Sequence, residues 1–259
     1  MCGRFAIDND ANEMLAEIVH EHGIGAIKDW QKYWPNYNFN IAPTDPVPVA
    51  RMHEGQRESV VVRWGLVPPS SPTFGGGKPI INARIETVAT NGLFRKPFAE
   101  RRCIVPALGY YEFQIRDYGK QPFFVHQPDS LLAFAGILGA WPDHNKPNDD
   151  PEKWKLSLSI ITMNAHAAPG EVHDRMPAML TPESYDDWLG DHLGTQELLA
   201  LLEQSTTQIA DHIDYYPVSR AVNKVQVSKG VPNNGRELVT PIDLTIEHRT
   251  TPRPDEALF

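Results

Sequence analysis

The sequence has few cysteines and no long hydrophobic run. Only Cys2 and Cys103 occur among 259 residues, so a disulfide framework is not expected and a reducing compartment, the cytoplasm, is predicted. The longest apolar run, Leu131 to Trp141, is far shorter than the roughly 20 residues that span a bilayer. No basic stretch followed by an apolar one opens the chain. These features predict a cytoplasmic protein with no membrane partner.

Positive charge is also scarce, because 24 Lys and Arg against 33 Asp and Glu give a formal net charge of −9. The charge is unevenly distributed. Residues 183–214 contain eight acids and no Lys or Arg, whereas residues 78–103 contain six bases and two acids, a local charge of +4. A local basic stretch can bind an anion on an acidic protein; an ordinary solvated face is the alternative. The net charge therefore does not exclude a nucleic-acid partner.

The first four residues, Met1-Cys2-Gly3-Arg4, carry the most unusual chemistry. If Met1 is removed, Cys2 presents an α-amine and a thiol on adjacent carbons. Their reference pKa values are about 7.7–8.0 and about 8.5, so part of each group is nucleophilic near neutral pH. The amine condenses with an aldehyde to an imine, and the thiol then closes a five-membered thiazolidine. The alternative is a chance start whose cysteine frays with the terminus.

The apolar pattern consists of many short strands and a few helices without a strand–helix–strand repeat. It predicts one α+β domain with a curved, barrel-like, mostly antiparallel sheet and a few flanking helices. We expect this domain over residues 2–230 and a partly loose C-terminal extension over residues 231–259. Strands are expected at 4–7, 60–67, 102–115, 121–126, 131–138, 155–162, 213–219 and near 225; helices at 10–20, 181–190 and 195–204; and loops at 68–77, 142–151 and 165–176.

Two local details concern the first helix. Asp10 and Glu13 fit a capping box at its N-terminus. His20 and His22 are possible metal ligands, but no third or fourth ligand follows at a suitable spacing. We therefore predict surface histidines and no metal site.

Reactive side chains elsewhere each have an ordinary explanation when taken singly. Period-two alternation in the strand expected at 102–115 places Tyr110 and Glu112 on one face and Tyr111 on the other. Glu112 could simply be solvated, His173 could be a loop histidine, and Trp64 could be a core residue. Spacing alone does not assemble these residues into a site.

Nine short motifs follow one another between residue 2 and about residue 225. They are Met1–Phe5 (MCGRF), Asn40–Pro43 (NIAP), Arg63–Pro68 (RWGLVP), Asn82–Thr87 (NARIET), Arg101–Pro106 (RRCIVP), Gly109–Glu112 (GYYE), Ala133–Ile137 (AFAGI), His173–Pro177 (HDRMP) and Pro217–Ser219 (PVS). In this order they resemble the SOS response-associated peptidase family, abasic-site processing proteins that protect single-stranded DNA. Two positions depart from the family pattern: Phe113 stands where Trp is frequent, and the loop at 70–77 is longer and richer in Gly.

The resemblance implies a catalytic set of four residues. Met1 would be removed, and the amine of Cys2 would attack C1′ of an opened abasic sugar before its thiol closes the thiazolidine. Glu112 would shuttle protons at the amine and thiol, Asn82 would orient the N-terminal residue, and His173 would promote ring opening as an acid–base group. The shared imine would also give weak lyase or crosslink-reversal activity. No metal or organic cofactor is implied.

The resemblance also implies a DNA-binding set. Arg84 and Arg175, together with Arg4, would hold phosphates, while Trp64 and Phe94 would stack on bases or wedge between them. The expected partner is single-stranded DNA that contains abasic sites, bound by a monomer that joins the nucleoid when it is on DNA.

Two other functions compete with this one. Glutamine amidotransferases with an N-terminal nucleophile also begin Met-Cys-Gly, but they need an Asn-Gly oxyanion pair. Asn91-Gly92 is the only nearby candidate, and the amidotransferase sequence around it is absent. A non-catalytic single-strand binding module would leave Cys2, Glu112 and His173 unexplained. Glutaminase activity would favour the first alternative, and unchanged DNA protection in Cys2→Ala would favour the second.

Overall fold

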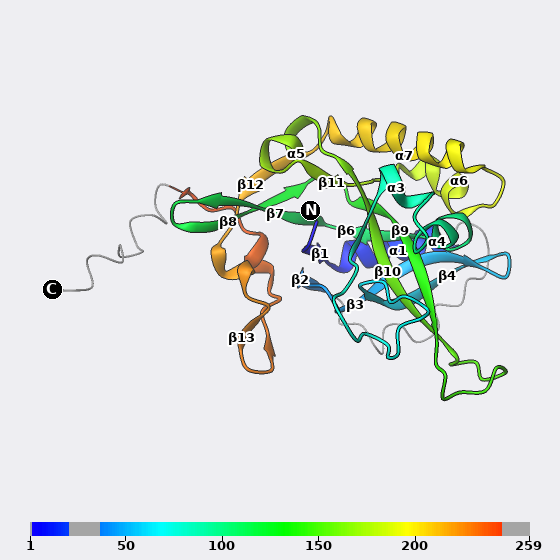
Figure 1. Ribbon diagram of the computed structural model, residues 1–259. Helices are drawn as coiled ribbons and strands as arrows, with labels where there is room; N and C mark the ends of the chain where they lie inside the picture. Colours follow the sequence, from blue (N-terminus) through cyan, green and yellow to red (C-terminus); the bar gives the residue numbers. More distant parts are fainter. Residues whose placement is uncertain (1, 21–36, 245–259) are drawn as a thin grey trace.

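The computed structural model describes residues 2–20 and 37–244 (Figure 1). The strands are β1 (Phe5–Ile7), β2 (Asn38–Ile41), β3 (Pro46–His53), β4 (Gln56–Trp64), β5 (Asn82–Arg84), β6 (Arg102–Ala107), β7 (Gly109–Arg116), β8 (Gly119–His126), β9 (Leu132–Pro142), β10 (Trp154–Asn164), β11 (Arg175–Pro177), β12 (Asp214–Pro217), β13 (Gln226–Ser228) and β14 (Val231–Pro232). The helices are α1 (Asn9–His20), α3 (Ile85–Val88), α4 (Arg95–Glu100), α5 (Ala167–Val172), α6 (Tyr185–Leu189) and α7 (Thr195–Ala210), with 3-10 turns η1 (Pro182–Ser184), η2 (Arg220–Asn223) and η3 (Arg236–Val239).

Five strands close into a barrel. In the order β4–β3–β6–β9–β10, each strand is hydrogen-bonded to the next, and β10 pairs back with β4. The closing pair is parallel, with Ser157 opposite Arg63, and the other four pairs are antiparallel. β5 and β11 pair with the far end of β10. The α+β class and the barrel-like, mostly antiparallel sheet predicted from the sequence are confirmed.

A second sheet, in the order β12–β8–β7–β1–β2, lies beside the barrel. It separates β7 from β6, so the single strand expected at 102–115 is wrong: the chain leaves the barrel at Leu108 and enters the other sheet at Gly109. A Cβ at Gly109 would lie 2.5 Å from the Phe124 ring and 2.6 Å from the carbonyl of Val125. Only glycine fits this close approach of β7 to β8.

The two sides of β7 face two different cores. Tyr110 belongs to the main core inside the barrel, whereas Tyr111 packs in a smaller cluster with Ala6, Phe39 and Phe124. The alternation predicted for this strand is therefore confirmed. Tyr110 and Glu112 are two residues apart on β7, so both side chains lie on the face of the sheet that is turned towards the main core.

The first helix is confirmed, but its cap is not the predicted one. The Ala11 N–H donates to Oδ1 of Asp8 at 3.1 Å, so Asp8 rather than Asp10 caps α1. Leu15 and Ile18 of this helix are buried in the main core. His22 and the side chain of His20 lie outside the described residues.

The segment expected to be a loop at 165–176 contains α5 and the beginning of β11. The six residues of α5 and three of β11 are too short for a periodic signal. The last long helix, α7, continues to Ala210, beyond its predicted end at residue 204. It packs against the main core through Leu198 and Leu202.

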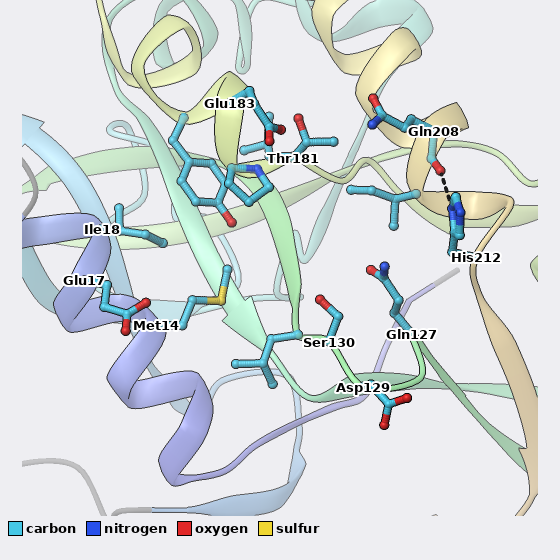
Figure 2. Close-up of a pocket in the computed structure, with 15 residues that line it drawn as sticks. Met14, Glu17, Ile18, Gln127, Asp129, Ser130, Thr181, Glu183, Gln208 and His212 are labelled. Atoms are coloured by element: carbon cyan, nitrogen blue, oxygen red, sulfur yellow. Dashed lines mark hydrogen bonds between the residues drawn. The ribbon is translucent and has the colours of Figure 1, made fainter.

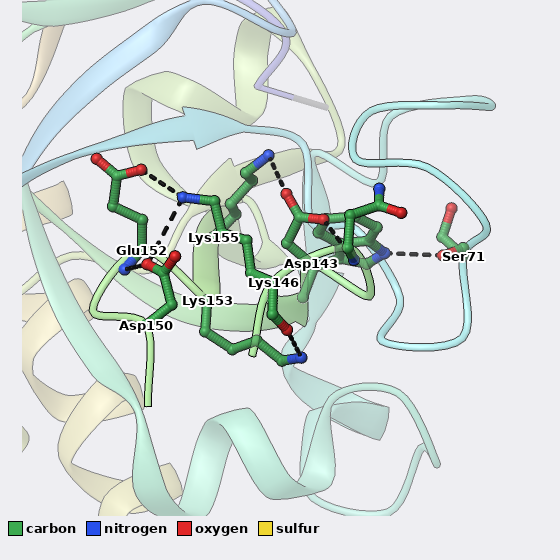
Figure 3. A network of polar contacts seen from close by, with 9 residues as sticks. Ser71, Asp143, Lys146, Asp150, Glu152, Lys153 and Lys155 are labelled. Carbon is green, nitrogen blue, oxygen red and sulfur yellow. Dashed lines mark hydrogen bonds and ion pairs between the residues drawn. The ribbon is translucent and has the colours of Figure 1, made fainter. Parts of the chain in front are cut away.

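The loop at 68–77, which precedes β5, is fixed to the β9–β10 hairpin (Figure 3). The indole of Trp141 donates to the carbonyl of Ser71 at 2.8 Å and packs against Phe74, with ring centroids 5.7 Å apart. The hairpin itself is held by ion pairs: Lys155 contacts Asp143 at 2.9 Å, and Lys146 contacts Asp150 and Glu152. The unusual loop is therefore anchored at its centre.

The folded body continues past residue 230, where the domain was expected to end. Leu238 of η3 is buried in the smaller cluster, and the Ile242 N–H donates to the carbonyl of Pro217 at 3.0 Å. The segment from Leu238 to Ile242 thus packs onto the second sheet. Within residues 2–20 and 37–244, no helix is both long and apolar enough to cross a membrane.

Candidate active site

One end of β10 collects several predicted site residues. β5 pairs with it in parallel, placing Asn82 opposite Ile160 and Arg84 opposite Thr162. On the same strand, β11 pairs antiparallel and places Arg175 opposite Asn164. Two segments about 90 residues apart in sequence are therefore brought to one edge of the barrel by a strand between them.

Cys2 reaches this edge from β1. The Tyr111 N–H donates to the carbonyl of Arg4 at 2.9 Å, which continues the β1–β7 pairing towards the terminus. Nδ2 of Asn82 donates to the carbonyl of Cys2 at 2.9 Å. Cys2 is fully buried, and burial raises the pKa of its thiol, with a further increase from the charge of Glu112. The alternative of a fraying terminal cysteine is wrong for Cys2.

Glu112 lies on the inner side of β7 and is only 3% exposed. Burial raises its pKa to about 7, and the negative charge of Asp174 also acts in this direction. A carboxyl group with this pKa exchanges protons readily at neutral pH. The structure thus places an ionisable carboxyl group close enough to influence the thiol of Cys2, and the solvated-strand explanation of Glu112 does not hold.

His173 follows α5, which is held against β7 by a hydrogen bond from Nε2 of Gln114 to the carbonyl of Glu171, 3.1 Å long. The side chain is half-buried, and burial lowers its pKa. The Arg175 N–H donates to Nδ1 at 3.0 Å, and the Asp174 carboxylate lies 2.7 Å from the same nitrogen. The amide contact uses Nδ1 as an acceptor, whereas the carboxylate contact uses it as a donor, so the two contacts serve different protonation states of the ring.

The two arginines predicted to bind phosphates differ in their surroundings. Arg84 is exposed. Arg175 is 12% exposed at its side chain and forms two bonds to the Glu86 carboxylate, at 2.5 and 3.1 Å. It also donates to Oδ1 of Asn164 at 2.7 Å and to the carbonyl of Thr162 at 2.6 Å. Arg84 is thus available to an anion, while Arg175 already has a carboxylate partner.

Arg4 is directed into the protein rather than towards solvent. Its Nη1 donates to Oδ1 of Asn40 at 2.6 Å and to the carbonyl of Val222 at 2.8 Å, and burial lowers its pKa. These bonds join β1 to β2 and to η2. The structure shows Arg4 as a positioning residue, and its phosphate contact stays a prediction.

The two aromatic rings predicted to stack on bases lie in the main core. Trp64 is 0% exposed, donates from its indole to the carbonyl of Ile81 at 3.1 Å and meets Phe5 edge-on at 5.0 Å. Base stacking needs an accessible ring face, so this conformation contradicts the stacking role of Trp64. Phe94 is 8% exposed at the start of α4, and its stacking role stays a prediction that requires a rotation outwards.

Sequence reasoning missed Tyr110 as a neighbour of the site. The residue is fully buried, and its pKa is raised well above the usual value by burial and by the charges of Glu112 and Cys2. Within the described part of the chain its hydroxyl has no hydrogen-bond partner. The alternation of β7 was the available signal, because it places Tyr110 on the same side as Glu112.

A separate cavity of about 610 Å³ contains none of these residues. The cavity is enclosed by α1, by the turn before β9, by η1 and by α7. The acids Glu17, Asp129 and Glu183 are among the residues that line it (Figure 2). On the α7 side of the cavity, Nδ1 of His212 is hydrogen-bonded to the carbonyl of Gln208 at 3.0 Å (Figure 2). Three carboxylates make this cavity unsuitable for a phosphate backbone.

The sequence profile of one family, described as SOS response associated peptidase (SRAP), matches residues 1–225. The chain belongs to this family. Among SRAP relatives, the abasic site processing protein YoqW of Bacillus subtilis is 32% identical over 242 residues, 92% of this chain and 99% of that protein. YedK of Escherichia coli is 28% identical over 93% of this chain and 100% of that protein. HMCES of Rattus norvegicus is 30% identical over 95% of this chain and 78% of that protein.

Solved structures show the same fold. A protein from Bacteroides thetaiotaomicron superposes with a TM-score of 0.72 at 22% identity and covers 93% of this chain and 100% of that one. A phage-related protein from Bordetella bronchiseptica superposes with a TM-score of 0.62 at 26% identity. The fold of this chain is therefore also found in these two proteins.

Proposed function

We propose that this protein processes abasic sites in single-stranded DNA by forming a covalent thiazolidine with the exposed N-terminal Cys2. The proposal draws on the family and on the names of the relatives, which are abasic site processing proteins. The observation that carries it is the environment of Cys2: its carbonyl is held by Asn82, and the buried Glu112 beside it has a pKa of about 7. A plain binding module needs neither feature.

The first step is imine formation. Hydrolysis of the Met1–Cys2 bond consumes one water and frees the amine; in keeping with the peptidase name of the family, we assign this step to the chain itself. The opened abasic sugar is an aldehyde. The amine of Cys2 adds to C1′, and loss of one water gives the imine. His173 assists ring opening by moving a proton between the sugar oxygens.

The second step is addition of the thiol across the imine. Its sulfur bonds to C1′, and its proton ends on the nitrogen, so no oxidant or further reactant is needed. Because burial raises the thiol pKa, the group enters protonated and needs a base. Glu112, with a pKa of about 7, takes the proton from sulfur and returns it to nitrogen. Crosslink reversal and weak lyase activity would branch from the same imine.

Intact mass spectrometry tests this proposal on the full chain, before and after incubation with a single-stranded oligonucleotide that carries one abasic site. The expected result is a protein without Met1, followed by a heat-stable species of protein plus DNA minus one water. The same oligonucleotide without the abasic site is the control. A protein that has lost Met1 and forms no such species would contradict the proposal.

Asn82→Ala is expected to slow adduct formation at saturating DNA about 3- to 10-fold, the loss of one net hydrogen bond of about 1 kcal/mol. The bond from Nδ2 to the Cys2 carbonyl fixes the position of the amine. Single-turnover rates on abasic DNA measure the effect, and binding to undamaged DNA serves as the control because it should not change. Equal losses of rate and affinity would instead indicate a structural role for Asn82.

Arg84→Ala is expected to weaken binding of single-stranded DNA of any sequence, because the guanidinium is exposed and can contact a phosphate. With about three to four phosphates bound, the slope of log affinity against log salt is about −2 to −3, and the variant reduces its magnitude by about 0.7. Fluorescence anisotropy titrations at several salt concentrations measure both values. Arg175→Ala is the comparison: it should lower the melting temperature as well, because it leaves Glu86 without its partner.

A further inference from the structure

A small hairpin formed by β13 and β14 projects from the body (Figure 1). We call residues 224–233 the terminal hairpin. Three of its apolar side chains face solvent: Val225 is 46% exposed, Val227 65% and Val231 48%. A two-stranded hairpin has no core of its own, and a cluster of exposed apolar side chains is typical of a contact surface.

The same part of the chain is basic. Residues 215–236 contain four bases and no acid, in contrast to the eight acids of residues 183–214. Lys224 at the base of the terminal hairpin and Lys229 at its tip are both exposed. Positive charges beside exposed apolar side chains match a nucleic-acid strand, which offers phosphates together with apolar base and sugar surfaces. The four bases are Arg220, Lys224, Lys229 and Arg236.

The base of the terminal hairpin is fixed to the segment that carries Cys2. Arg4, two residues after Cys2, donates to the carbonyl of Val222 immediately before the hairpin, and to Oδ1 of Asn40. Asn40 is 3% exposed. Arg4, in the segment that carries Cys2, thus connects the base of the terminal hairpin to the candidate active site.

A second layer of buried hydrogen bonds completes this connection. Nδ2 of Asn40 donates to the carbonyls of Lys224 at 3.0 Å and Asn233 at 2.8 Å. Asn233, 6% exposed, donates to the carbonyl of Lys224 at 2.9 Å, and its N–H donates to the carbonyl of Val225 at 3.0 Å. These bonds close the base and leave the tip free to contact a ligand.

From these observations we infer that the terminal hairpin is a second DNA-binding element, which holds the strand that flanks the nucleotide captured at Cys2. Lys224 and Lys229 bind phosphates, while Val227 and Val231 pack against bases and sugars. The choice of DNA as the ligand rests on the proposed function. The hydrogen bonds of Arg4 then explain why this residue points inwards: it connects the two binding elements.

Binding of an undamaged single-stranded oligonucleotide, measured by fluorescence anisotropy, tests this inference without the covalent step. The double variant K224A/K229A should bind about 10-fold more weakly at low salt and lose about 1.4 from the magnitude of the salt slope, 0.7 for each phosphate. V227S/V231S should bind more weakly with an unchanged slope. Lys229→Arg and Met52→Ser, at a position on β3 that is 38% exposed, are the controls and should bind like the wild type.

Unchanged affinity and slope in K224A/K229A would overturn the inference. So would a dimeric wild type that becomes monomeric in V227S/V231S by sedimentation, because the valines would then join two copies of the chain. Urea unfolding shows whether each variant folds. If V227S/V231S does not fold, the binding of K224A/K229A decides whether the inference holds. Loss of the Cys2 adduct with hairpin-dependent binding retained would refute the proposed function instead and leave the hairpin assignment standing.

Discussion

Replacing Cys2 with Ser is expected to abolish the heat-stable adduct with abasic single-stranded DNA while leaving an imine that borohydride traps. The variant keeps the N-terminal amine, so addition to the aldehyde and loss of water still occur. Its hydroxyl is a much weaker nucleophile than a thiol, so the ring does not close to a stable product. Cys2→Ala should behave in the same way. Denaturing gels after heating, with and without borohydride, separate the two products.

Cys103→Ala is the matched control for this experiment. Cys103 is as buried as Cys2, and burial raises its thiol pKa as well, but it lies in β6, a barrel strand, and carries no α-amine. This variant should retain the stable adduct. A heat-stable product in Cys2→Ser, or its loss in a folded Cys103→Ala, would show that the aminothiol is not the reacting group.

Much of the fold follows from local pattern. The alternation of β7 predicts which side chains share a face, and it agrees with the structure, where Tyr110 and Tyr111 pack in different cores. β3 was missed because Pro46 and Pro48 suggest an irregular segment. The structure explains their presence: β6 pairs with β3 only at Ala50 and Arg51, so the prolines lie where β3 has a partner on one side alone.

The candidate site is less accessible to sequence reasoning, because its members are brought together by pairing between distant strands. Asn82 meets Cys2 only because β5 adds to β10 and β1 adds to β7. Periodicity does not show which strands pair. The motifs supplied the catalytic residues through family resemblance, but they did not distinguish exposed Arg84 from Arg175, which is bound to Glu86, or show that Trp64 is buried.

Glu112→Gln is expected to raise the free energy of unfolding at pH 8 while slowing adduct formation. In the folded chain the pKa of Glu112 is about 7, above the reference value of about 4.3 for an unfolded glutamate. The folded state therefore holds the proton more tightly, and stability falls as the pH rises between these two values. Above pH 7 the full cost is present, on the order of 3–4 kcal/mol, and the neutral amide of the variant removes it.

Urea unfolding at pH 4.5 and pH 8 measures this difference: the variant should gain stability over the wild type at pH 8 and little at pH 4.5. Glu203→Gln, at an exposed position on α7, is the control and should show no such dependence.

In Glu112→Gln the rate of adduct formation should fall about 10²- to 10⁴-fold, the usual contribution of a positioned acid–base group. In the wild type this rate should rise through pH 7 as Glu112 ionises, and the variant should retain only the rise that belongs to the amine. A variant that is less stable at pH 8 would mean that Glu112 supports the fold as a carboxylate, and the proton-transfer role would then have to pass to His173.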